Sequence, residues 1–449
     1  MKLRDDQTGG RAAMRMRAVT RDTARRQGVA ALAAAGVVTA GVAVAIVGTG
    51  SDQAAAARSA VGDAQRHSER VLFDGGREAV GGVKYHSFRI PALVRTKKNT
   101  VLAFAEGRVK GSADYGDIDL VYKRSTDSGA SWSSLRRVIG SGAGTWGNPT
   151  PVADLRSGTI WLFMSWNPAH YSETGGHGTT KITQWGQRKV YLSSSRDDGL
   201  TWSKPVDLTA RLKPKKLANG KTWAWDAIGP GTGIQTTVSH PGRLIVSAQF
   251  RDIYSDDHGK TWKVRRIVDK STKAYQERTG ESTIAELADG TLYRNDRPLK
   301  KYWVTAKRRL VARGTIEGGF TAFAPDKALL EPTNGCGAST LRYNVGKPSR
   351  LVFLNSASTK TRTRMTVRIS YDAGRSWPIA RAFGDAPLPG QSSSYQEGGY
   401  SSMATLANNR VGALVEVNEN VNSTSSHRSI AFRTVNLSWI LGGKREPSS

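Results

Sequence analysis

Short runs of apolar and β-branched residues, separated by turn-forming residues, dominate the chain between residues 71 and 442. The runs richest in strand-favouring residues, each bounded by Gly, Pro, Asn or Asp, are residues 159–166, 189–195, 243–250, 351–356 and 365–371. No long segment after the N-terminal leader shows a convincing helical period. The pattern therefore predicts an all-β protein built from short strands.

An eight-residue pattern, Ser-x-Asp-x-Gly-x-Ser/Thr-Trp, recurs among these strands. Intact copies begin at Ser125, Ser195, Ser255 and Ser370, and a degenerate copy begins at Thr315. The starts are 55 to 70 residues apart, a step that suits one four-stranded blade of a β-propeller. Asp and Ser can bind turn amides, Gly permits an unusual backbone angle and Trp packs well. We interpret the octets as scaffold rather than as repeated ligand sites.

The octets and the remaining strands together predict a six-bladed β-propeller over residues 71–442. The sixth blade would combine a strand near residues 71–73 with C-terminal strands at residues 410–417 and 429–435. This arrangement closes the ring and removes the exposed edges of an open sheet. Residues 443–449 are short and polar, and we expect a disordered tail.

The first 57 residues have the character of a targeting segment. A basic stretch ending at Arg25-Arg26 precedes 22 uncharged residues, and small residues near Ala56 and Ala57 offer cleavage sites. We expect a signal peptide, a linker at residues 58–70 and secretion of the mature protein. About 20 apolar residues can span a bilayer, so a retained anchor on the outer face of the membrane is the alternative.

The chain is strongly basic, with 66 Lys and Arg against 37 Asp and Glu and a net charge of +29. A basic surface favours anionic polymers or cell surfaces. No stretch interleaves basic and aromatic residues, which argues against nucleic acid as a partner. Cys336 is the only cysteine, so an intrachain disulfide is excluded, and the seven histidines lack metal-ligand spacing. We expect neither a metal nor an organic cofactor.

Two motifs stand upstream of the first octet: Phe-Arg-Ile-Pro at residues 88–91 and Glu-Gly-Arg at residues 106–108. With the octets behind them, they resemble the bacterial sialidases of glycoside hydrolase family 33, over residues 71–441. The resemblance implies an exo-α-sialidase that removes terminal α-linked sialic acid with retained configuration. Its partners would be sialylated glycoproteins, glycolipids or oligosaccharides, and the enzyme would be a monomer.

The resemblance also implies a set of site residues. The catalytic group would be Tyr400 as the nucleophile, Glu281 as its base and Asp114 as the acid/base residue. The substrate-binding group would be the arginines Arg89, Arg297, Arg362 and Arg108. Several positions have neighbours that compete for the same role, namely Asp117 and Asp119 with Asp114, Arg294 with Arg297, and Arg364 with Arg362.

This residue set suits an acid sugar. Sialic acid carries its carboxylate on the carbon that is attacked, and guanidinium groups bind carboxylates in a forked geometry that Lys lacks. A neutral tyrosine avoids the repulsion that a carboxylate nucleophile would meet. The pocket for an N-acyl group could include tryptophans from loop-like stretches, with Trp146, Trp166, Trp185, Trp223 and Trp225 as the candidates.

Other functions remain open at this level. A related nonulosonic acid could replace sialic acid, and a sugar acceptor could replace water. The octets could also persist in a non-catalytic carbohydrate-binding propeller. A glucan-cleaving propeller is a further possibility, but it would need paired carboxylates and has no use for three convergent arginines.

Overall fold

The structure is a computed structural model of the full chain. It describes residues 64–140, 142, 144–300, 307–333, 335–343, 346–384, 396–418 and 427–447. The expected leader at residues 1–57, the first part of the expected linker and the last two residues lie outside the described residues. Among the residues described, the search for a helix with the length and apolar character needed to cross a membrane finds none.

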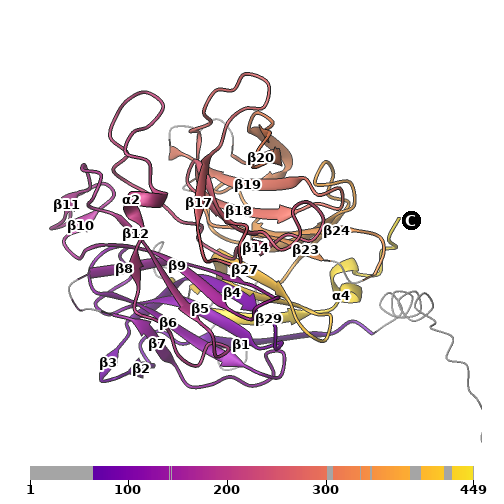
Figure 1. The fold of residues 1–449 in the computed structure, drawn as a ribbon. Helices are drawn as coiled ribbons and strands as arrows, with labels where there is room; N and C mark the ends of the chain where they lie inside the picture. Colours follow the sequence, from indigo (N-terminus) through magenta and orange to yellow (C-terminus); the bar gives the residue numbers. More distant parts are fainter. Residues whose placement is uncertain are drawn as a thin grey trace, which may run out of the picture. The chain divides into compact units, whose positions relative to one another are not determined.

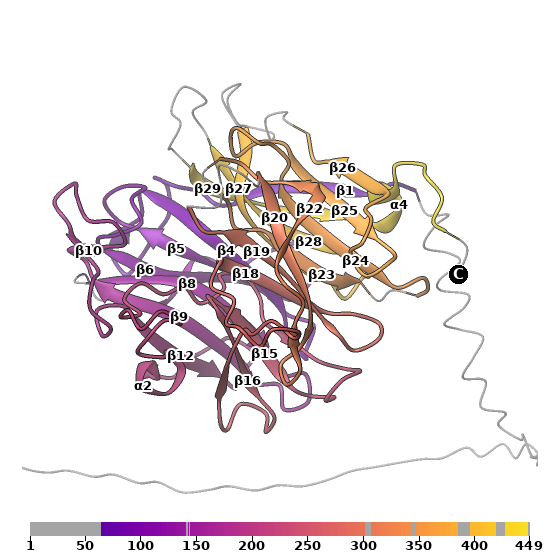
Figure 2. The ribbon, with the colours of Figure 1, turned by 90° about the horizontal axis from the view of Figure 1, so that it is seen from above.

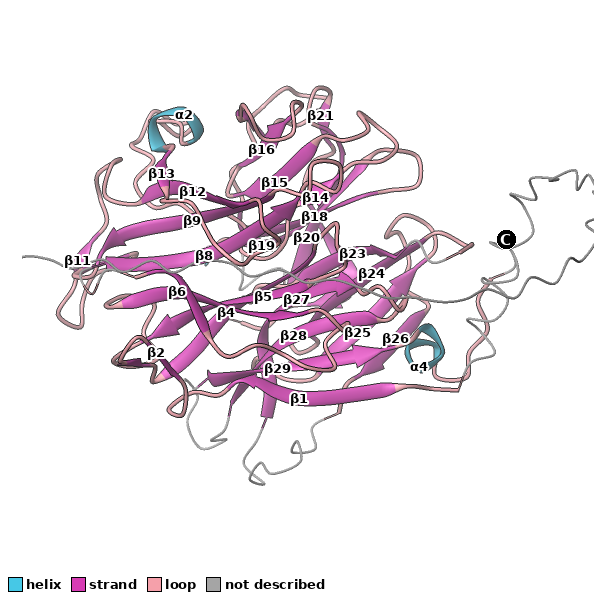
Figure 3. Cartoon of the chain, turned by 60° about the horizontal axis from the view of Figure 1, so that its bottom comes forward, coloured by secondary structure: helices cyan, strands magenta, loops and turns pink. Residues whose placement is uncertain are grey.

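Antiparallel strands make up nearly all of the regular structure (Figure 1, Figure 3). Within the described part of the chain, the helices are two short segments, α2 (Thr209–Leu212) and α4 (Leu437–Leu441). The runs richest in strand-favouring residues all form strands: β9 (Ile160–Pro168), β12 (Lys189–Ser195), β15 (Leu244–Ala248), β24 (Arg350–Ser356) and β25 (Met365–Ser370). The all-β prediction is confirmed.

The strands pair in chain order, each with the next. The first two groups are β4 (Ser87–Arg95), β5 (Val101–Arg108), β6 (Ile118–Ser125) and β7 (Arg136–Ile139), then β8 (Gly144–Ala153), β9, β12 and β13 (Val206–Asp207). A single parallel pairing of Ile118 with Thr145 joins these groups into one eight-stranded sheet. The number of hydrogen-bonded sheets therefore does not by itself establish the six expected blades.

The remaining groups are separate sheets. One comprises β14 (Ile234–Gln235), β15, β16 (Arg251–Ser255) and β17 (Lys263–Arg266). The next comprises β18 (Thr279–Glu286), β19 (Leu292–Pro298), β20 (Arg308–Thr315), β21 (Gly319–Phe320) and β22 (Ala324–Leu330). Another comprises β23 (Ser339–Tyr343), β24, β25 and β26 (Ile379–Ala382). Two-stranded sheets form from β2 (Ala79–Val80) with β3 (Val83–Lys84) and from β10 (Tyr171–Ser172) with β11 (Thr180–Lys181).

The last sheet joins the two ends of the described chain. Its order is β27 (Gln396–Thr405), β28 (Val411–Asn418), β29 (His427–Val435) and β1 (His67–Phe73), as expected from the sequence. β1 runs beside β29 in two views (Figure 1, Figure 3). β27 lies against β4, β4 against β8, β14 against both β8 and β18, β18 against β23, and β23 against β27. The first strands of the groups thus surround one axis, as in a β-propeller (Figure 2).

The octets form turns between the last two strands of their groups. In the first copy, Ser125 Oγ accepts from the Gly129 amide at 2.7 Å, and Asp127 Oδ1 accepts from the Ser131 amide at 2.9 Å. Gly129 has φ +89°, and a Cβ there would lie 2.3 Å from the ring of Phe432 on β29. The glycine of each intact octet therefore packs against a neighbouring group of strands, which confirms the structural interpretation of the octets.

Two expected boundaries are wrong. β1 begins at His67, so the last residues of the expected linker belong to a strand, and Ser68 Oγ lies 2.6 Å from Thr434 Oγ1 on β29. The tail is also tied down where it is described, because Arg350 Nε donates to Glu446 Oε1 at 2.6 Å and Tyr371 donates to the same oxygen at 2.9 Å. Ion pairing and pairing of the ends, which composition does not reveal, order both segments.

Replacing Gly259 with Ala is expected to destabilise the fold through packing as well as through backbone strain. The glycine has φ +84°, and an added Cβ would lie 2.2 Å from the Trp161 ring. Gly220 is the matched control, because it has φ +76° and no atom within 4 Å of an added Cβ. Urea unfolding should show a loss of about 1–3 kcal/mol for Gly259→Ala beyond that of Gly220→Ala. Equal losses would contradict the packing role.

Candidate active site

One cavity of about 520 Å³ collects all seven residues for which the sequence predicts a site role. They come from different sheets and loops: Arg89 on β4, Arg108 at the end of β5, Asp114 in the following loop, Glu281 on β18, Arg297 on β19, Arg362 between β24 and β25, and Tyr400 on β27. Residues more than 300 positions apart in the sequence thus share one cavity.

Irregular strand backbone directs several of these side chains. The pairing register shifts between residues 89 and 92 in β4, between 279 and 282 in β18, and between 397 and 401 in β27. Bulges of this kind bend a strand, re-aim a side chain and are frequent beside active sites. Ile90, next to Arg89, has φ 57°, which is strained for a β-branched residue. Arg89, Glu281 and Tyr400 all lie at these irregular stretches.

Three guanidinium groups surround the side chain of Tyr400. The Cζ atoms of Arg89 and Arg362 lie 5.8 and 5.4 Å from the centroid of its ring. Arg297 Nη1 donates to the Tyr400 hydroxyl at 2.7 Å. Planar forks of this kind bind carboxylates with two parallel hydrogen bonds. The arrangement suits a substrate that carries a carboxylate next to its reacting atom.

The Tyr400 hydroxyl donates to Oε1 of Glu281, and Arg297 Nη1 donates to Glu281 Oε2 at 2.6 Å. Only 6% of the Tyr400 surface is exposed. Burial raises the pKa of the Tyr400 phenol well above its usual value; the charge of Glu281 adds to this shift, and the charge of Arg297 opposes it. The phenol is therefore neutral before reaction, and Glu281 is placed to accept its proton.

Asp114 stands across the cavity on an open loop. Its Oδ1 lies 2.7 Å from Arg108 Nη1 and 4.0 Å from Arg89 Nη1. Asp114 lines the cavity, and water reaches 80% of its side chain. Desolvation alone would raise the pKa of Asp114, but the charges of Arg108 and Arg89 outweigh it and hold that pKa well below its usual range. Asp114 is therefore ionised at neutral pH.

The competing residues lie elsewhere. Arg294 is fully buried and pairs with Asp252 and Asp296, and it does not line the cavity. Asp119 is also buried and accepts from the Tyr85 hydroxyl at 2.7 Å, away from the cavity lining. Asp117 and Arg364 do not line the cavity either. The structure thus places Arg297, Asp114 and Arg362 at the site, rather than their rivals.

Glu416 on β28 is a site residue that the sequence reasoning missed. Its carboxylate accepts from Arg89 Nε at 2.8 Å and Nη2 at 3.1 Å, and from the amides of Ile90 at 2.8 Å and Tyr400 at 2.9 Å. Burial would raise the pKa of Glu416, but the charge of Arg89 outweighs it and lowers the pKa to about 2. In the sequence, Glu416 is the only acid in the apolar run 411–417. This position could have identified it as a residue with a specific partner, because a buried charge needs one.

Other polar residues of the lining were also missed. Glu106 Oε2 accepts from Arg108 Nη2 at 2.6 Å, and its Oε1 accepts from the Asn148 amide at 3.0 Å. Arg188 is buried, and its Nη2 donates to Asn148 Oδ1 at 3.0 Å. Glu106 belongs to a motif that the sequence singled out, whereas no local pattern marks Asn148 or Arg188.

Of the five candidate tryptophans, only Trp225 lines the cavity. The guanidinium of Arg188 stacks on its ring, with Cζ 4.1 Å from the centroid. Trp146 and Trp166 pack with Tyr191 in the core, and Trp223 is buried against Phe250. The fifth candidate, Trp185, donates from its indole nitrogen to the carbonyl of Pro214 at 3.1 Å. Three of the five therefore pack against other aromatic rings, and the fourth is held by a hydrogen bond outside the cavity lining.

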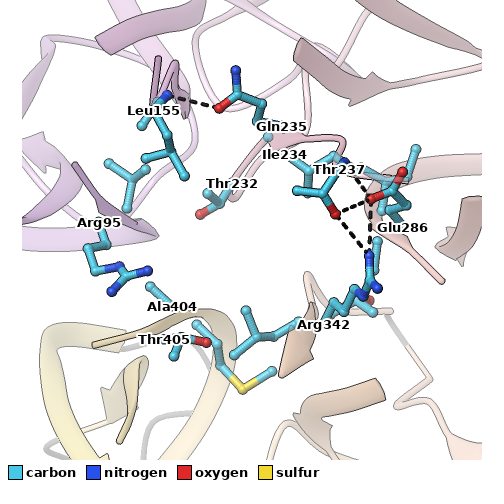
Figure 4. Close-up of a pocket in the computed structure, with 18 residues that line it drawn as sticks. Arg95, Leu155, Thr232, Ile234, Gln235, Thr237, Glu286, Arg342, Ala404 and Thr405 are labelled. Carbon is cyan, nitrogen blue, oxygen red and sulfur yellow. Dashed lines mark hydrogen bonds and ion pairs between the residues drawn. The ribbon is translucent and has the colours of Figure 1, made fainter. Parts of the chain in front are cut away.

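A second cavity, of about 250 Å³, lies at the other ends of the same inner strands (Figure 4). Apolar side chains contribute much of its lining, together with Arg95, Gln235 and an ion pair of Glu286 with Arg342 at 3.1 Å. None of the predicted site residues contributes to it. We therefore assign the chemistry to the larger cavity, which holds the convergent arginines.

Comparison with known proteins identifies the family of the chain. Residues 99–413 match the BNR repeat-like domain family. The chain is 48% identical to an exo-alpha-sialidase of Aspergillus fumigatus, over 81% of this chain and 87% of that protein. It is 44% identical to an exo-alpha-sialidase of Arthroderma benhamiae, over 85% of this chain and 92% of that protein.

A solved structure extends the likeness to the fold. The Hadza microbial sialidase Hz136 is 27% identical and superposes with a TM-score of 0.62, over 79% of this chain and 67% of the other. The residues that match the family include Arg108, Asp114, Glu281, Arg297, Arg362 and Tyr400. This chain belongs to the exo-α-sialidase family of BNR-repeat β-propellers.

Proposed function

We propose that this protein is a retaining exo-α-sialidase that hydrolyses terminal α-linked sialic acid from glycoproteins, glycolipids or oligosaccharides. The observation that carries the proposal is the contact of Tyr400 with Glu281 and Arg297 inside a cavity that Arg89 and Arg362 also line. Similarity to exo-alpha-sialidases supports the choice of sugar.

The charge of the substrate explains the choice of nucleophile. The sialic acid carboxylate is attached to the anomeric carbon, and Arg89, Arg297 and Arg362 would hold it there. Two like charges about 4 Å apart repel by about 4 kcal/mol at an effective dielectric constant of about 20. A neutral phenol meets no such repulsion. Sialidases with a tyrosine nucleophile are a known exception to the two-carboxylate rule of glycosidases.

The reaction would proceed in two displacements. Tyr400 Oη attacks the anomeric carbon while Glu281 takes the phenol proton, and Asp114 donates a proton to the departing glycosidic oxygen. Asp114 then removes a proton from water, which attacks the same carbon. Tyr400 leaves and recovers its proton from Glu281. Two inversions at one carbon retain its configuration.

The arginine field at Asp114 would change when substrate binds. The charges of Arg108 and Arg89 keep the pKa of Asp114 low. A bound carboxylate would neutralise part of this positive charge, so the pKa of Asp114 would rise toward the range in which it can donate a proton. Substrate binding would thereby help to prepare the acid.

We further propose that the ring comprises six blades, with the eight-stranded sheet counted as two. Its two four-stranded groups are joined by the backbone pairing of a single residue pair, which supports this count. We also propose that the protein is exported and acts as a monomer; the N-terminal leader supports export.

Tyr400→Phe is expected to lower kcat/KM on a methylumbelliferyl α-sialoside by about 10³-fold or more, because the phenyl ring offers no nucleophile. A fluorinated sialic acid that traps the covalent intermediate should add its mass to the peptide containing Tyr400 in the native enzyme only. Tyr275→Phe, at a half-exposed tyrosine outside the cavity, is the control. Full turnover by Tyr400→Phe would rule out this nucleophile.

Asp114→Asn is expected to slow hydrolysis of a sialyl disaccharide more than hydrolysis of an aryl sialoside. An aryl leaving group departs readily without a proton, whereas a sugar alkoxide does not. The ratio of the two losses in kcat/KM should be about 10²-fold or more, the usual range for general acid catalysis. Asp117→Asn should lose neither activity. Equal losses on both substrates would contradict the acid role of Asp114.

Glu416→Gln is expected to destabilise the protein by about 3–5 kcal/mol and to raise KM, because it leaves buried Arg89 without its counter-charge. The pKa of Glu416 is about 2 in the fold against 4.5 ordinarily, so its stabilising effect is complete above pH 4.5 and fades as the pH falls toward 2. Urea unfolding across that range should show the native protein and the variant converging. A constant difference would contradict the charge pairing.

A further inference from the structure

The segment Gly335–Gly337 runs directly beneath three of the site residues, and we propose that it is a positioning element for catalysis. It would hold Tyr400, Arg297 and Arg362 in their working geometry without itself touching substrate. This inference rests on the proposed function, because it assumes that Tyr400 is the nucleophile.

The ring of Tyr400 lies against the bare α-carbon of Gly337. A Cβ at Gly337 would lie 2.4 Å from Cδ2, 2.8 Å from Cε2 and 2.9 Å from Cγ of that ring. Contacts below 3.0 Å force one partner to move, and the Tyr400 ring is buried and cannot retreat freely. Cys336 completes the seat, since it forms a buried apolar cluster with Ile90 and Tyr400.

Gly335 likewise lies in direct contact with Arg297 and Arg362. Its carbonyl accepts from Arg362 Nε at 3.2 Å. A Cβ at Gly335 would lie 2.4 Å from Nε of Arg297, and the residue has φ +64°. Two of the arginines that would bind the carboxylate therefore contact the same glycine.

A buried ion pair locks the segment to the strand that carries Arg297. Glu331 Oε1 accepts from the Cys336 amide at 2.7 Å and from Arg309 Nη1 at 3.1 Å. The same Arg309 nitrogen donates to the Cys336 carbonyl at 2.7 Å, and Arg309 Nε donates to Asn295 Oδ1 on β19 at 2.7 Å. Glu331 and Arg309 are both 1% exposed, so the clamp is part of the core.

Substitution of the two glycines should therefore affect different properties of the enzyme. Gly337 governs the nucleophile, so its effect should fall on the chemical step. Gly335 governs the arginines, so its effect should fall on binding of the carboxylate. A displacement of about 1 Å at a reacting group can cost about 10²-fold in rate. A purely structural role would instead reduce both properties together through loss of folded protein.

Gly337→Ala is therefore expected to lower kcat by about 10²-fold, while the inhibition constant of an unreactive unsaturated sialic acid changes by less than about threefold. Gly335→Ala is expected to raise that inhibition constant by about tenfold or more, through displacement of Arg297 and Arg362. Gly186→Ala is the control, because Gly186 is exposed and an added Cβ there has no neighbour within 4 Å. Far-ultraviolet circular dichroism and Tm would verify folding of each variant.

A double variant tests whether Gly337 acts through Tyr400. In the Tyr400→Phe background, Gly337→Ala should cause no further loss of residual turnover, because the group that it displaces is already absent. An equal loss in both backgrounds, or native kcat in Gly337→Ala, would overturn the proposal. Full turnover by Tyr400→Phe alone would instead overturn the proposed function, so the two failures are distinguishable.

Glu331→Gln tests the clamp if Gly337→Ala does not fold. The amide oxygen can still accept from Cys336 but no longer neutralises Arg309. We expect kcat to fall by about threefold to tenfold in the folded variant, with the inhibition constant unchanged. Native kcat in folded Glu331→Gln would overturn the positioning role of the clamp.

Discussion

The pairing of β1 with β29 is the constraint on which the rest of the structure depends. It joins the first described strand to the last, so that β4 lies beside β27 and β28. Arg89 then meets Glu416, a residue 327 positions away, and both meet Tyr400. In an open sheet these groups would face solvent separately, and the cavity that they line would not exist.

Arginines of the cavity form ion pairs with neighbouring carboxylates. Arg89 pairs with Glu416, Arg108 with Glu106, and Arg297 with Glu281. An isolated buried charge is costly, so each of these arginines has a carboxylate that also fixes its orientation. Glu416 does more, since it also binds the amides of Ile90 and Tyr400. The cavity can therefore receive an anion without first reorganising its cations.

Several glycines of this fold allow close contacts because they lack a side chain. In the octets, glycine at positive φ lets a turn touch a neighbouring sheet, as Gly259 touches Trp161. Beneath the cavity, Gly335 and Gly337 let backbone touch Arg297 and Tyr400 directly. The same physical property thus serves assembly at the outer hairpins and precision at the site.

Prediction from the sequence succeeded where the signal was local. Runs of strand-favouring residues located β9, β12 and β24, and the Phe-Arg-Ile-Pro motif located Arg89. Prediction failed where the role of a residue depends on a partner that lies far away in the sequence. Arg294 and Arg297 are both plausible in isolation, and only the presence of Asp252 beside one and Tyr400 beside the other separates them. Glu446 was taken for part of a disordered tail because Arg350, which binds it, is 96 residues away.

The sequence by itself determined the repeated turns, the all-β class and the chemical kinds of group available for an acid sugar. These follow from side-chain size, backbone freedom and charge, which each residue carries with it. Only the tertiary structure decided which arginines converge, that Glu416 holds Arg89, and that Gly337 seats Tyr400. Those facts depend on ring closure, which brings together strands whose separation along the chain gives no hint of their contact.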